Sequence, residues 1–252
     1  MAKGFQYRDI SNFPKMQVGE AYKTVTQPVL PWTEQGFDDS VHSVITYLGK
    51  SAHPDFFRFH AEHETLRPYR VRFNNERRDS VIVVEEFDLF IPKNYSYVWA
   101  DTNSKNCNEL LRRLIDTERN RDNRFSFVEH KIDLIKMEKD IQPSITGGHF
   151  NELNIADVRA ASIFGEGVGG SADWQRYEDS GSLSAIVFQV PFYGTMQRIM
   201  VTKNGGIVIY SNFKEHDALI LVEEINEKVR DYISDSLHTE SIDSSDQDLL
   251  EL

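Results

Sequence analysis

Hydrophobic and polar residues alternate along much of the chain, and the alternation predicts two strands in its first half. They are VIVVEEFDLFI, residues 81–91, and YSYVWA, residues 95–100, both rich in β-branched and aromatic side chains and separated by a Pro-Lys-Asn turn sequence. Asn103 or Ser104 can then cap a helix. The apolar stripe of that helix consists of Cys107, Leu110, Leu111, Leu114 and Ile115.

A similar order returns near the C-terminus. The alternating segments are LSAIVFQVPFYG, residues 183–194, and QRIMVTKNGGIVIYS, residues 197–211, and the Asn-Gly-Gly sequence at 204–206 indicates a hairpin. A final helix is marked by an apolar stripe at Ala218, Leu221, Val222, Ile225, Val229 and Tyr232. The two blocks predict an α+β fold with a largely antiparallel sheet built from strand-turn-strand-helix units.

Three further segments are interpreted from their spacing. Residues 124–137, RFSFVEHKIDLIKM, alternate like a strand for most of their length, and residues 154–165, NIADVRAASIFG, fit a strand or a short helix. A short amphipathic helix that ends at Gly49 is predicted from apolar positions at helical spacing, which are Val41, Val44, Ile45 and Leu48.

The chain divides into three parts by composition. Residues 1–37 hold three prolines and little periodicity, so we expect an extended N-terminal arm lying against the domain. Residues 38–233 form the α+β domain, either undivided or as two sub-blocks, 38–142 and 143–233. Residues 234–252 are rich in Ser and Asp and poor in aromatic residues, which predicts a flexible acidic tail.

Composition narrows the class of protein. The formal net charge is −12, and the segment from Asp231 to Leu252 holds seven acids and no Lys or Arg, so the rest of the chain carries −5, which is −12 minus −7. Cys107 is the one cysteine and cannot form an internal disulfide. The apolar runs are too short to span a bilayer, so we expect a cytoplasmic protein without a membrane partner.

The segment IFGEGVGGSADW contains Gly165, Gly167 and Gly170 in the G-x-G-x-x-G spacing that can cradle a dinucleotide pyrophosphate. That motif requires a strand before the glycines, a helix that opens at the third glycine, and an acid after the next strand to hold the ribose. Only the strand is indicated here. The segment after Gly170 can form at most two helical turns before Gly181, and no acidic residue follows the next strand in the required place. We therefore expect a glycine loop joining two sheet elements, and no dinucleotide cofactor.

Two clusters suggest metal chemistry. His53, His60 and His63 lie close together in the sequence and are candidate ligands for zinc or manganese. The Phe/Arg alternation around them favours a strand, in which residues three apart point to opposite faces, so solvated side chains are the simpler interpretation. Asp101 and Glu129-His130-Lys131 resemble the Asp…Glu-x-Lys core of restriction-endonuclease-like nucleases.

That resemblance implies a specific chemistry. Asp101 and Glu129 would hold Mg²⁺ or Mn²⁺ against a scissile phosphate, and Lys131 would steady the attacking water. Against it, a whole predicted helix separates Asp101 from Glu129. Cys107 falls on an apolar helix stripe, and the sequence contains neither a Gly-x-Ser-x-Gly elbow nor a complete Gly-x-x-x-x-Gly-Lys-Ser/Thr phosphate loop. A non-catalytic protein is therefore favoured over an enzyme.

Arginines interleave with aromatic residues between residues 56 and 78, a composition that can pair with phosphates and stack on bases or on the rings of a protein partner. We therefore predict a macromolecule-binding or regulatory protein that contacts nucleic acid or protein through this surface. The alternatives are the nuclease and a structural subunit of a larger assembly, and the oligomeric state stays open. The candidate binding residues are Arg58, Arg67, Tyr69, Arg70, Arg72, Phe73, Arg77 and Arg78.

Overall fold

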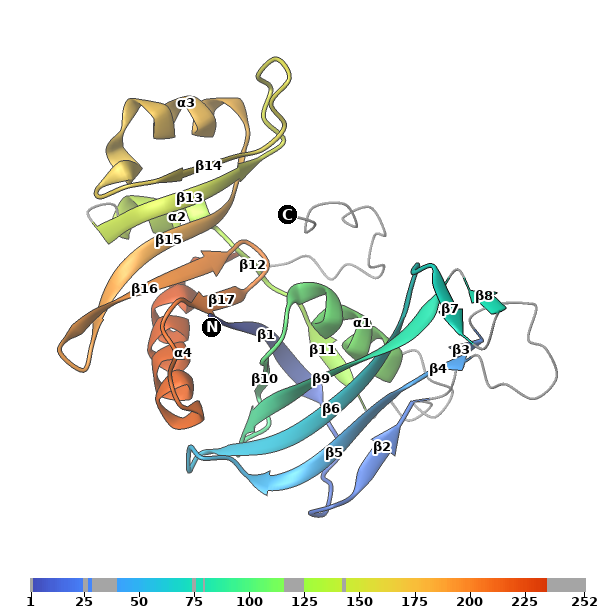
Figure 1. Ribbon diagram of the computed structural model, residues 1–252. Coiled ribbons are helices and arrows are strands. Elements are labelled where there is room, and N and C mark those ends of the chain that lie inside the picture. Colours follow the sequence, from blue (N-terminus) through green and yellow to red (C-terminus); the bar gives the residue numbers. More distant parts are fainter. Residues whose placement is uncertain are drawn as a thin grey trace.

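The computed structural model describes residues 2–24, 27–28, 40–73, 76–78, 80–115, 125–141 and 144–234. Within this part, one sheet of twelve strands runs in the order β14, β13, β15, β16, β17, β1, β10, β9, β6, β5 and β2, and β11 pairs with β1 beside this path (Figure 1). The pairings between these strands are all antiparallel. The α+β class and the largely antiparallel sheet are therefore confirmed.

The strands of the sheet are β1 Lys3–Asn12, β2 Ala21–Lys23, β5 Ser43–Lys50, β6 Phe56–Arg67, β9 Val81–Pro92, β10 Tyr97–Ala100, β11 Ser126–Val128, β13 Ile145–Asn151, β14 Ala161–Phe164, β15 Ser182–Phe192, β16 Thr195–Thr202 and β17 Gly206–Ile209. Three separate ladders join β3 Gln27–Pro28 to β4 Ser40–Val41, β7 Val71–Phe73 to β8 Glu76–Arg78, and β12 Lys131–Ile132 to β18 Ile233–Ser234. The helices are α1 Ser104–Ile115, α2 Leu134–Ile141, α3 Ala172–Ser180 and α4 Glu215–Val229, with short 3₁₀ helices η3 Val168–Gly170 and η4 Arg230–Tyr232.

β1 lies in the middle of the sheet. It pairs with β17 through residues 3–6, with β10 through residues 6–9 and with β11 through residues 9–12. The prediction that residues 1–37 form an arm lying against the domain is therefore wrong for this segment, which is extended but integral to the sheet. Its partners lie far away in the sequence, so no local pattern could reveal them. Of the predicted acidic tail, the residues after Ser234 lie outside the described residues.

Each face of the sheet carries a hydrophobic cluster, and β10 contributes to both. Tyr97 and Trp99 belong to the first cluster, which also contains residues of α2, α3 and α4. Val98 and Ala100 belong to the second, which contains the buried stripe of α1. This is the period-two alternation of a strand that is buried on both sides. In Figure 1, α1 accordingly lies with the N-terminal strands, whereas α2, α3 and α4 lie with the C-terminal strands.

The helix that follows β10 begins where the sequence predicts. The Asn103 side chain accepts a hydrogen bond from the backbone N–H of Asn106 at 2.9 Å, which makes Asn103 the cap. Of the predicted stripe, Cys107, Leu110, Leu111 and Leu114 are buried. In α4, Ala218, Leu221, Val222, Ile225 and Val229 are buried likewise. No helix in the described part of the chain is long and apolar enough to cross a membrane.

The helix predicted to end at Gly49 is wrong, because residues 43–50 form β5. Ser43, Ile45 and Tyr47 are buried and alternate with half-buried or exposed neighbours, which is a strand pattern. The spacing of the apolar residues fitted both periods, and pairing with β2 and β6 on either side decided for the strand. Gly49 has a φ of 96° and stands where the register with β6 shifts.

The strand predicted over residues 124–137 is only partly correct. The alternation forms the short strands β11 and β12, and then the chain turns into α2 at Leu134. Asp133 starts this helix, since its carboxylate accepts a hydrogen bond from the backbone N–H of Lys136 at 3.0 Å. Leu134 and Met137 are then buried three residues apart. For residues 154–165, the strand alternative is correct over β14.

Glu138 of α2 gives a testable pH dependence. Burial raises the pKa of its carboxyl to about 7, and the charge of Glu178 adds to the rise. The folded protein therefore holds this proton more tightly than the unfolded chain, and stability falls as the pH rises through about 7. We expect Glu138→Gln to leave Tm nearly unchanged at pH 5 and to raise it at pH 8, by about 2–4 °C per kcal/mol regained.

Thermal unfolding followed by circular dichroism at both pH values measures this effect. Glu227→Gln is the matched control, because Glu227 is exposed on α4. A Tm difference for Glu138→Gln that is the same at pH 5 and pH 8 would contradict the assignment.

Candidate functional site

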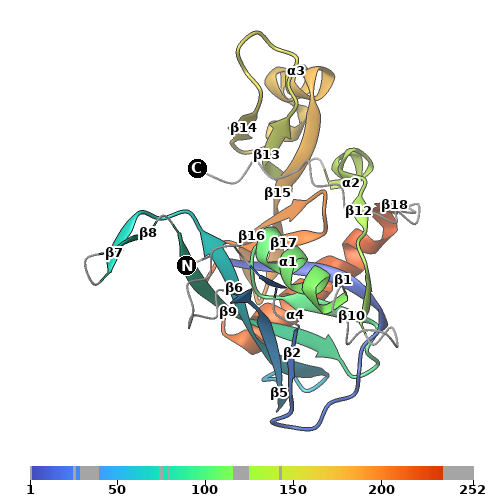
Figure 2. The ribbon, with the colours of Figure 1, turned by 90° about the vertical axis from the view of Figure 1, so that its right-hand side faces the viewer.

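The longest ladder of the sheet leads to a projecting hairpin. β6 and β9 pair without a break from Phe56 opposite Pro92 to Arg67 opposite Val81. Past the end of this ladder, β7 and β8 pair only with each other, and in Figure 2 they project from the body of the molecule. We call residues 66–83, which contain β7, β8 and the adjoining ends of β6 and β9, the arginine hairpin.

The arginine hairpin is a cationic part of an acidic chain. Its five arginines face two acids, Glu76 and Asp79, so its formal charge is +5 minus 2, or +3. The whole chain carries −12, which leaves −15 for the remaining residues. The five arginines are Arg67, Arg70, Arg72, Arg77 and Arg78.

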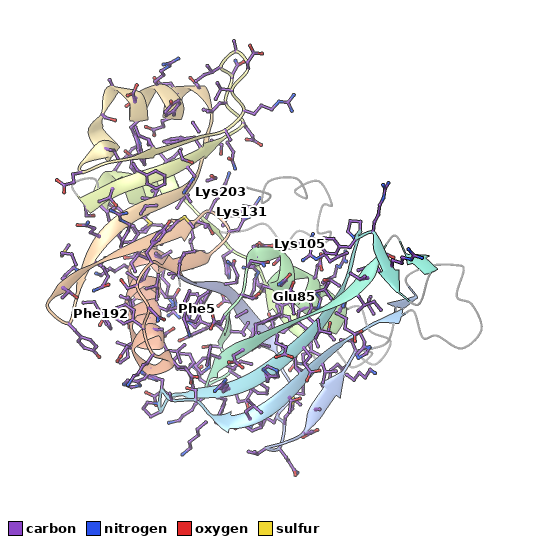
Figure 3. All side chains as sticks on the ribbon, viewed as in Figure 1. Phe5, Glu85, Lys105, Lys131, Phe192 and Lys203 are labelled. Carbon is purple, nitrogen blue, oxygen red and sulfur yellow. The ribbon has the colours of Figure 1, made fainter. Side chains whose placement is uncertain are left out.

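The described side chains of the hairpin are accessible. Tyr69 is 58% exposed, and Arg70 and Arg72 are exposed. Arg67 is partly exposed and lies 3.7 Å from a carboxylate oxygen of Glu85, which Figure 3 labels on β9. A surface ion pair at that distance contributes little, so Arg67 can exchange Glu85 for another anion at small cost.

The backbone register brings further arginines together. Arg72 stands directly opposite Arg77, and Val71 stands opposite Arg78. The side chains of Phe73, Arg77 and Arg78 lie outside the described part, but their backbones belong to β7 and β8. The backbone therefore collects the predicted residues from Arg67 to Arg78 in the arginine hairpin, from the end of β6 to β8.

Arg58 does not belong to this surface. It lies nine residues before Arg67 on β6, and its guanidinium contacts Asp88 at 2.7 Å and Glu215 of α4 at 3.3 Å. The hydrogen bond to Asp88 is the main cause of a raised pKa for Arg58. Because two carboxylates already neutralise it, Arg58 joins the N-terminal strands to α4 and is not available to a partner.

An apolar patch adjoins the hairpin at its base. Leu66 stands opposite Ile82, and Val84 follows two residues later on the same face of β9. All three side chains are at least 38% exposed. Sequence periodicity did not single them out, because residues 81–84 are apolar at every position, whereas in the structure they alternate between half-buried and exposed.

The three histidines proposed as metal ligands are separated by the strand. His63 is fully buried, whereas His60 faces the other side of β6 and lies 3.3 Å from Asp88. His53 stacks on His216 of α4, with ring centroids 5.3 Å apart. Within the described residues, no group of three or more His, Cys, Asp or Glu side chains has the geometry to hold a metal ion. The prediction that His60 and His63 point to opposite faces of the strand is therefore correct.

His63 instead belongs to a buried polar network that the sequence did not indicate. Its Nδ1 is 2.8 Å from the Ser43 hydroxyl and its Nε2 is 3.3 Å from the Glu109 carboxylate. Arg113 donates hydrogen bonds to the Ser43 hydroxyl and to the backbone oxygen of Glu64. The hydrogen bond with His63 lowers the pKa of Glu109.

A serine, a histidine and a carboxylate within hydrogen-bond reach of one another suggest a nucleophile and its base. Ser43 and His63 are both fully buried, however, so no substrate carbonyl can reach the hydroxyl. Ser43 also accepts a hydrogen bond from Arg113, which draws electron density away from the oxygen. The network therefore satisfies buried polar groups and fastens α1 to β5 and β6.

The structure does not bring the three nuclease residues together. Asp101 pairs with Lys3 at 3.4 Å, and burial raises the pKa of its carboxyl while Lys3 opposes the rise. Glu129 pairs with Arg8 at 2.9 Å. Lys3 and Arg8 are five residues apart on β1, so their backbones are about 16 Å apart and their side chains point to opposite faces of the sheet.

Lys131, the third nuclease residue, lies beside Lys203 (Figure 3), since the backbone N–H of the adjacent Ile132 donates to the Lys203 oxygen at 2.8 Å.

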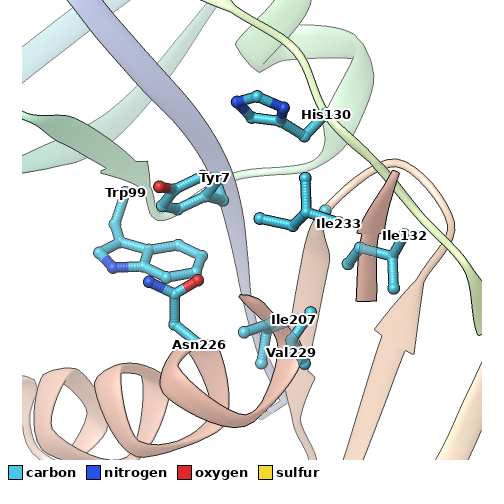
Figure 4. Close-up of a pocket in the computed structure, with 9 residues that line it drawn as sticks. Tyr7, Trp99, His130, Ile132, Ile207, Asn226, Val229 and Ile233 are labelled. Atoms are coloured by element: carbon cyan, nitrogen blue, oxygen red, sulfur yellow. The ribbon is translucent and has the colours of Figure 1, made fainter. Parts of the chain in front are cut away.

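A small pocket opens between β1, β10 and the end of α4 (Figure 4). Tyr7, Trp99, His130 and Asn226 supply its polar atoms, and Ile132 and Ile233 are among its apolar walls. Outside the lining, Asp9 accepts a hydrogen bond from the Tyr7 hydroxyl and lies 2.5 Å from His130 Nε2. Burial is the main cause of a raised pKa for Tyr7. His130 Nδ1 has no hydrogen-bond partner among the described residues, and the two Asp9 contacts hold the segment after β11 against β1.

The glycine loop differs from its prediction in one respect. A helix, α3, does open shortly after the glycines, with Ser171 accepting a hydrogen bond from the backbone N–H of Trp174. The strands on either side of it, β14 and β15, are not neighbours, because the antiparallel β13 lies between them. Gly169 packs so closely on Ile145 that a Cβ would lie 2.8 Å from its side chain. Gly169 thus serves close packing, whereas Gly167 has a φ of 63° and nothing within 4 Å of where a Cβ would lie.

Cys107, the one cysteine, is fully buried, and burial raises the pKa of its thiol to about 11. It is a core residue of α1. Comparison of the sequence with protein-family models finds no match, and comparison with curated proteins finds none either.

The two histidines of β6 provide a matched pair of substitutions. His63→Ala removes a fully buried ring and leaves Ser43 and Glu109 without their partner, so we expect a loss of about 3–5 kcal/mol in the free energy of unfolding. His60→Ala, on the half-exposed face, should cost less than about 1 kcal/mol. Urea unfolding measures both. Equal losses of unfolding free energy in the two variants would show that the buried network adds no stability of its own.

Proposed function

We propose that this protein is a non-catalytic nucleic-acid-binding protein whose contact surface is the arginine hairpin. The observation that carries the proposal is the collection of five arginines and Tyr69 on a projecting two-stranded ribbon with a net charge of +3. Guanidinium groups pair with phosphate oxygens in bidentate geometry, and a two-stranded ribbon is narrow enough to enter the major groove of B-form DNA.

The register of the ribbon supports an anionic partner. Arg72 and Arg77 occupy directly opposite positions of the ladder, so the register concentrates positive charge at one place on the ribbon. Tyr69, 58% exposed beside Arg70, adds an aromatic ring on which a base can stack.

The charge of the remaining chain supports a local contact. With −15 outside the hairpin, the rest of the surface repels a polyanion on average, so the number of phosphates contacted is limited to what the hairpin can reach. This favours a few strong arginine contacts over a broad basic surface. An acidic protein segment would satisfy the same arginines, and oligonucleotide binding at low salt separates the two kinds of partner.

Replacing Arg70, Arg72, Arg77 and Arg78 by Ala should weaken nucleic-acid binding and flatten its salt dependence. On duplex DNA, each phosphate that the variant no longer neutralises should reduce the slope of log K against log salt concentration by about 0.9. Fluorescence anisotropy with labelled single-stranded and duplex oligonucleotides over a range of salt concentrations measures both quantities.

The matched control replaces Arg112, Arg159, Arg176 and Arg198, four exposed arginines outside the hairpin, so that the net charge changes equally. Affinity and slope that fall in both variants to the same extent would show a general charge effect and reject the hairpin as the contact surface. Absence of binding by the unmodified protein at low salt would reject nucleic acid as the partner.

A further inference from the structure

The two ends of the sheet differ in how they are protected. At one end, β2 presents Lys23 and follows Glu20, and charged side chains of this kind discourage edge-to-edge pairing. At the other end, β14 has the sequence Ala-Ser-Ile-Phe with no charged residue. Among the described strands, β14 pairs only with β13. One of its edges is therefore an uncharged template for another strand.

An apolar row crosses the sheet and ends at this edge. Directly opposite residues of an antiparallel ladder lie on the same face, and the registers of successive strands connect one row. The row runs through Phe164, Gly147, Val187, Met200, Val208 and Gly4. Neither hydrophobic cluster of the core includes a residue of this row, in which Gly147 and Val187 are buried and Phe164 is exposed. We call this side of β13–β17 the open face.

The open face has the composition of an interface. Its outer end is Phe164, which is 56% exposed, and Met196 and Tyr210 are also exposed on this side. Arg198 is the only residue with a formal charge in the five strands from β13 to β17. Aromatic residues, Met and Arg are enriched in protein interfaces, whereas Lys, Glu and Asp are depleted. A chain of net charge −12 can approach its own copy most easily through such a surface.

We infer that β14 pairs antiparallel with β14 of a second copy of this chain. A two-fold axis perpendicular to the sheet, passing beside Ile163, sets Ser162 of one copy opposite Phe164 of the other, and these two side chains share one face. This operation keeps the open faces of the two copies on the same side, so they form one surface. A strand can pair with its own copy in this way without any other sequence, which is why a second copy suits the edge.

Light scattering during size-exclusion chromatography of the full chain tests the inference. The expected mass at high protein concentration is twice 29.1 kDa. The double variant Ser162→Lys, Phe164→Lys places charge on the edge and should halve that mass. Ala21→Lys adds a lysine to β2 at the opposite end of the sheet and should leave the dimer intact. Circular dichroism establishes that all three proteins are folded.

Hydrogen exchange gives a second readout that needs no substitution. The amides of residues 161–164 should exchange more slowly as the protein concentration rises, whereas those of β2 should not change. A monomeric mass for the unmodified protein at every concentration would overturn the inference. A dimer that persists in the double-lysine variant, as it does in Ala21→Lys, would overturn it equally, because the contact would lie elsewhere.

Discussion

The pairing of β1 on both of its edges is the constraint on which the rest of the structure depends. Arg8 shows how completely this strand is enclosed, since its side chain is 3% exposed. Its guanidinium donates to Asn108 of α1, to Glu129 after β11, and to the backbone oxygens of Tyr7 and Asn204. A buried guanidinium is tolerated only when acceptors surround it, so the three segments that hold Asn108, Glu129 and Asn204 must assemble around β1 together.

From β1 outward, the helices cover opposite faces of the sheet. α1 packs on one face of the N-terminal strands, and α2, α3 and α4 pack on the other face of the C-terminal strands. The cluster that contains α4 also includes Phe90, Tyr97 and Trp99, so the N-terminal strands next to β1 are buried on both faces. The N-terminal and C-terminal strands are joined in part through the Glu223 carboxylate of α4, which accepts hydrogen bonds from Tyr97 and Trp99 of β10. The open face and the end of the β6–β9 ladder near Arg67 contribute no residue to either cluster.

The sequence predicts the elements whose pattern is local and unambiguous. β9, β10, α1 and α4 each have a pattern that fits one period, and the arginine hairpin is a run of one residue type. Elements decided by distant partners could not be found in this way. β5 has apolar spacing that fits both a helix and a strand, and β1 has partners that lie about 90 to 200 residues further along the chain. The Ser43, His63 and Glu109 network spans 66 residues and has no sequence spacing of its own.

The distribution of charge separates the two accessible surfaces by physical type. The arginine hairpin concentrates +3 on a chain that is −15 elsewhere, so its attraction to a partner is electrostatic and weakens as salt is added. The strands of the open face carry only Arg198, so contact there depends on apolar area and backbone hydrogen bonds, which salt screens little. The β6–β9 ladder and β14 stand on opposite sides of β1 in the strand order. Because β1 separates them, a partner bound at the hairpin and a second copy paired at β14 engage different halves of the sheet and need not compete for the same residues.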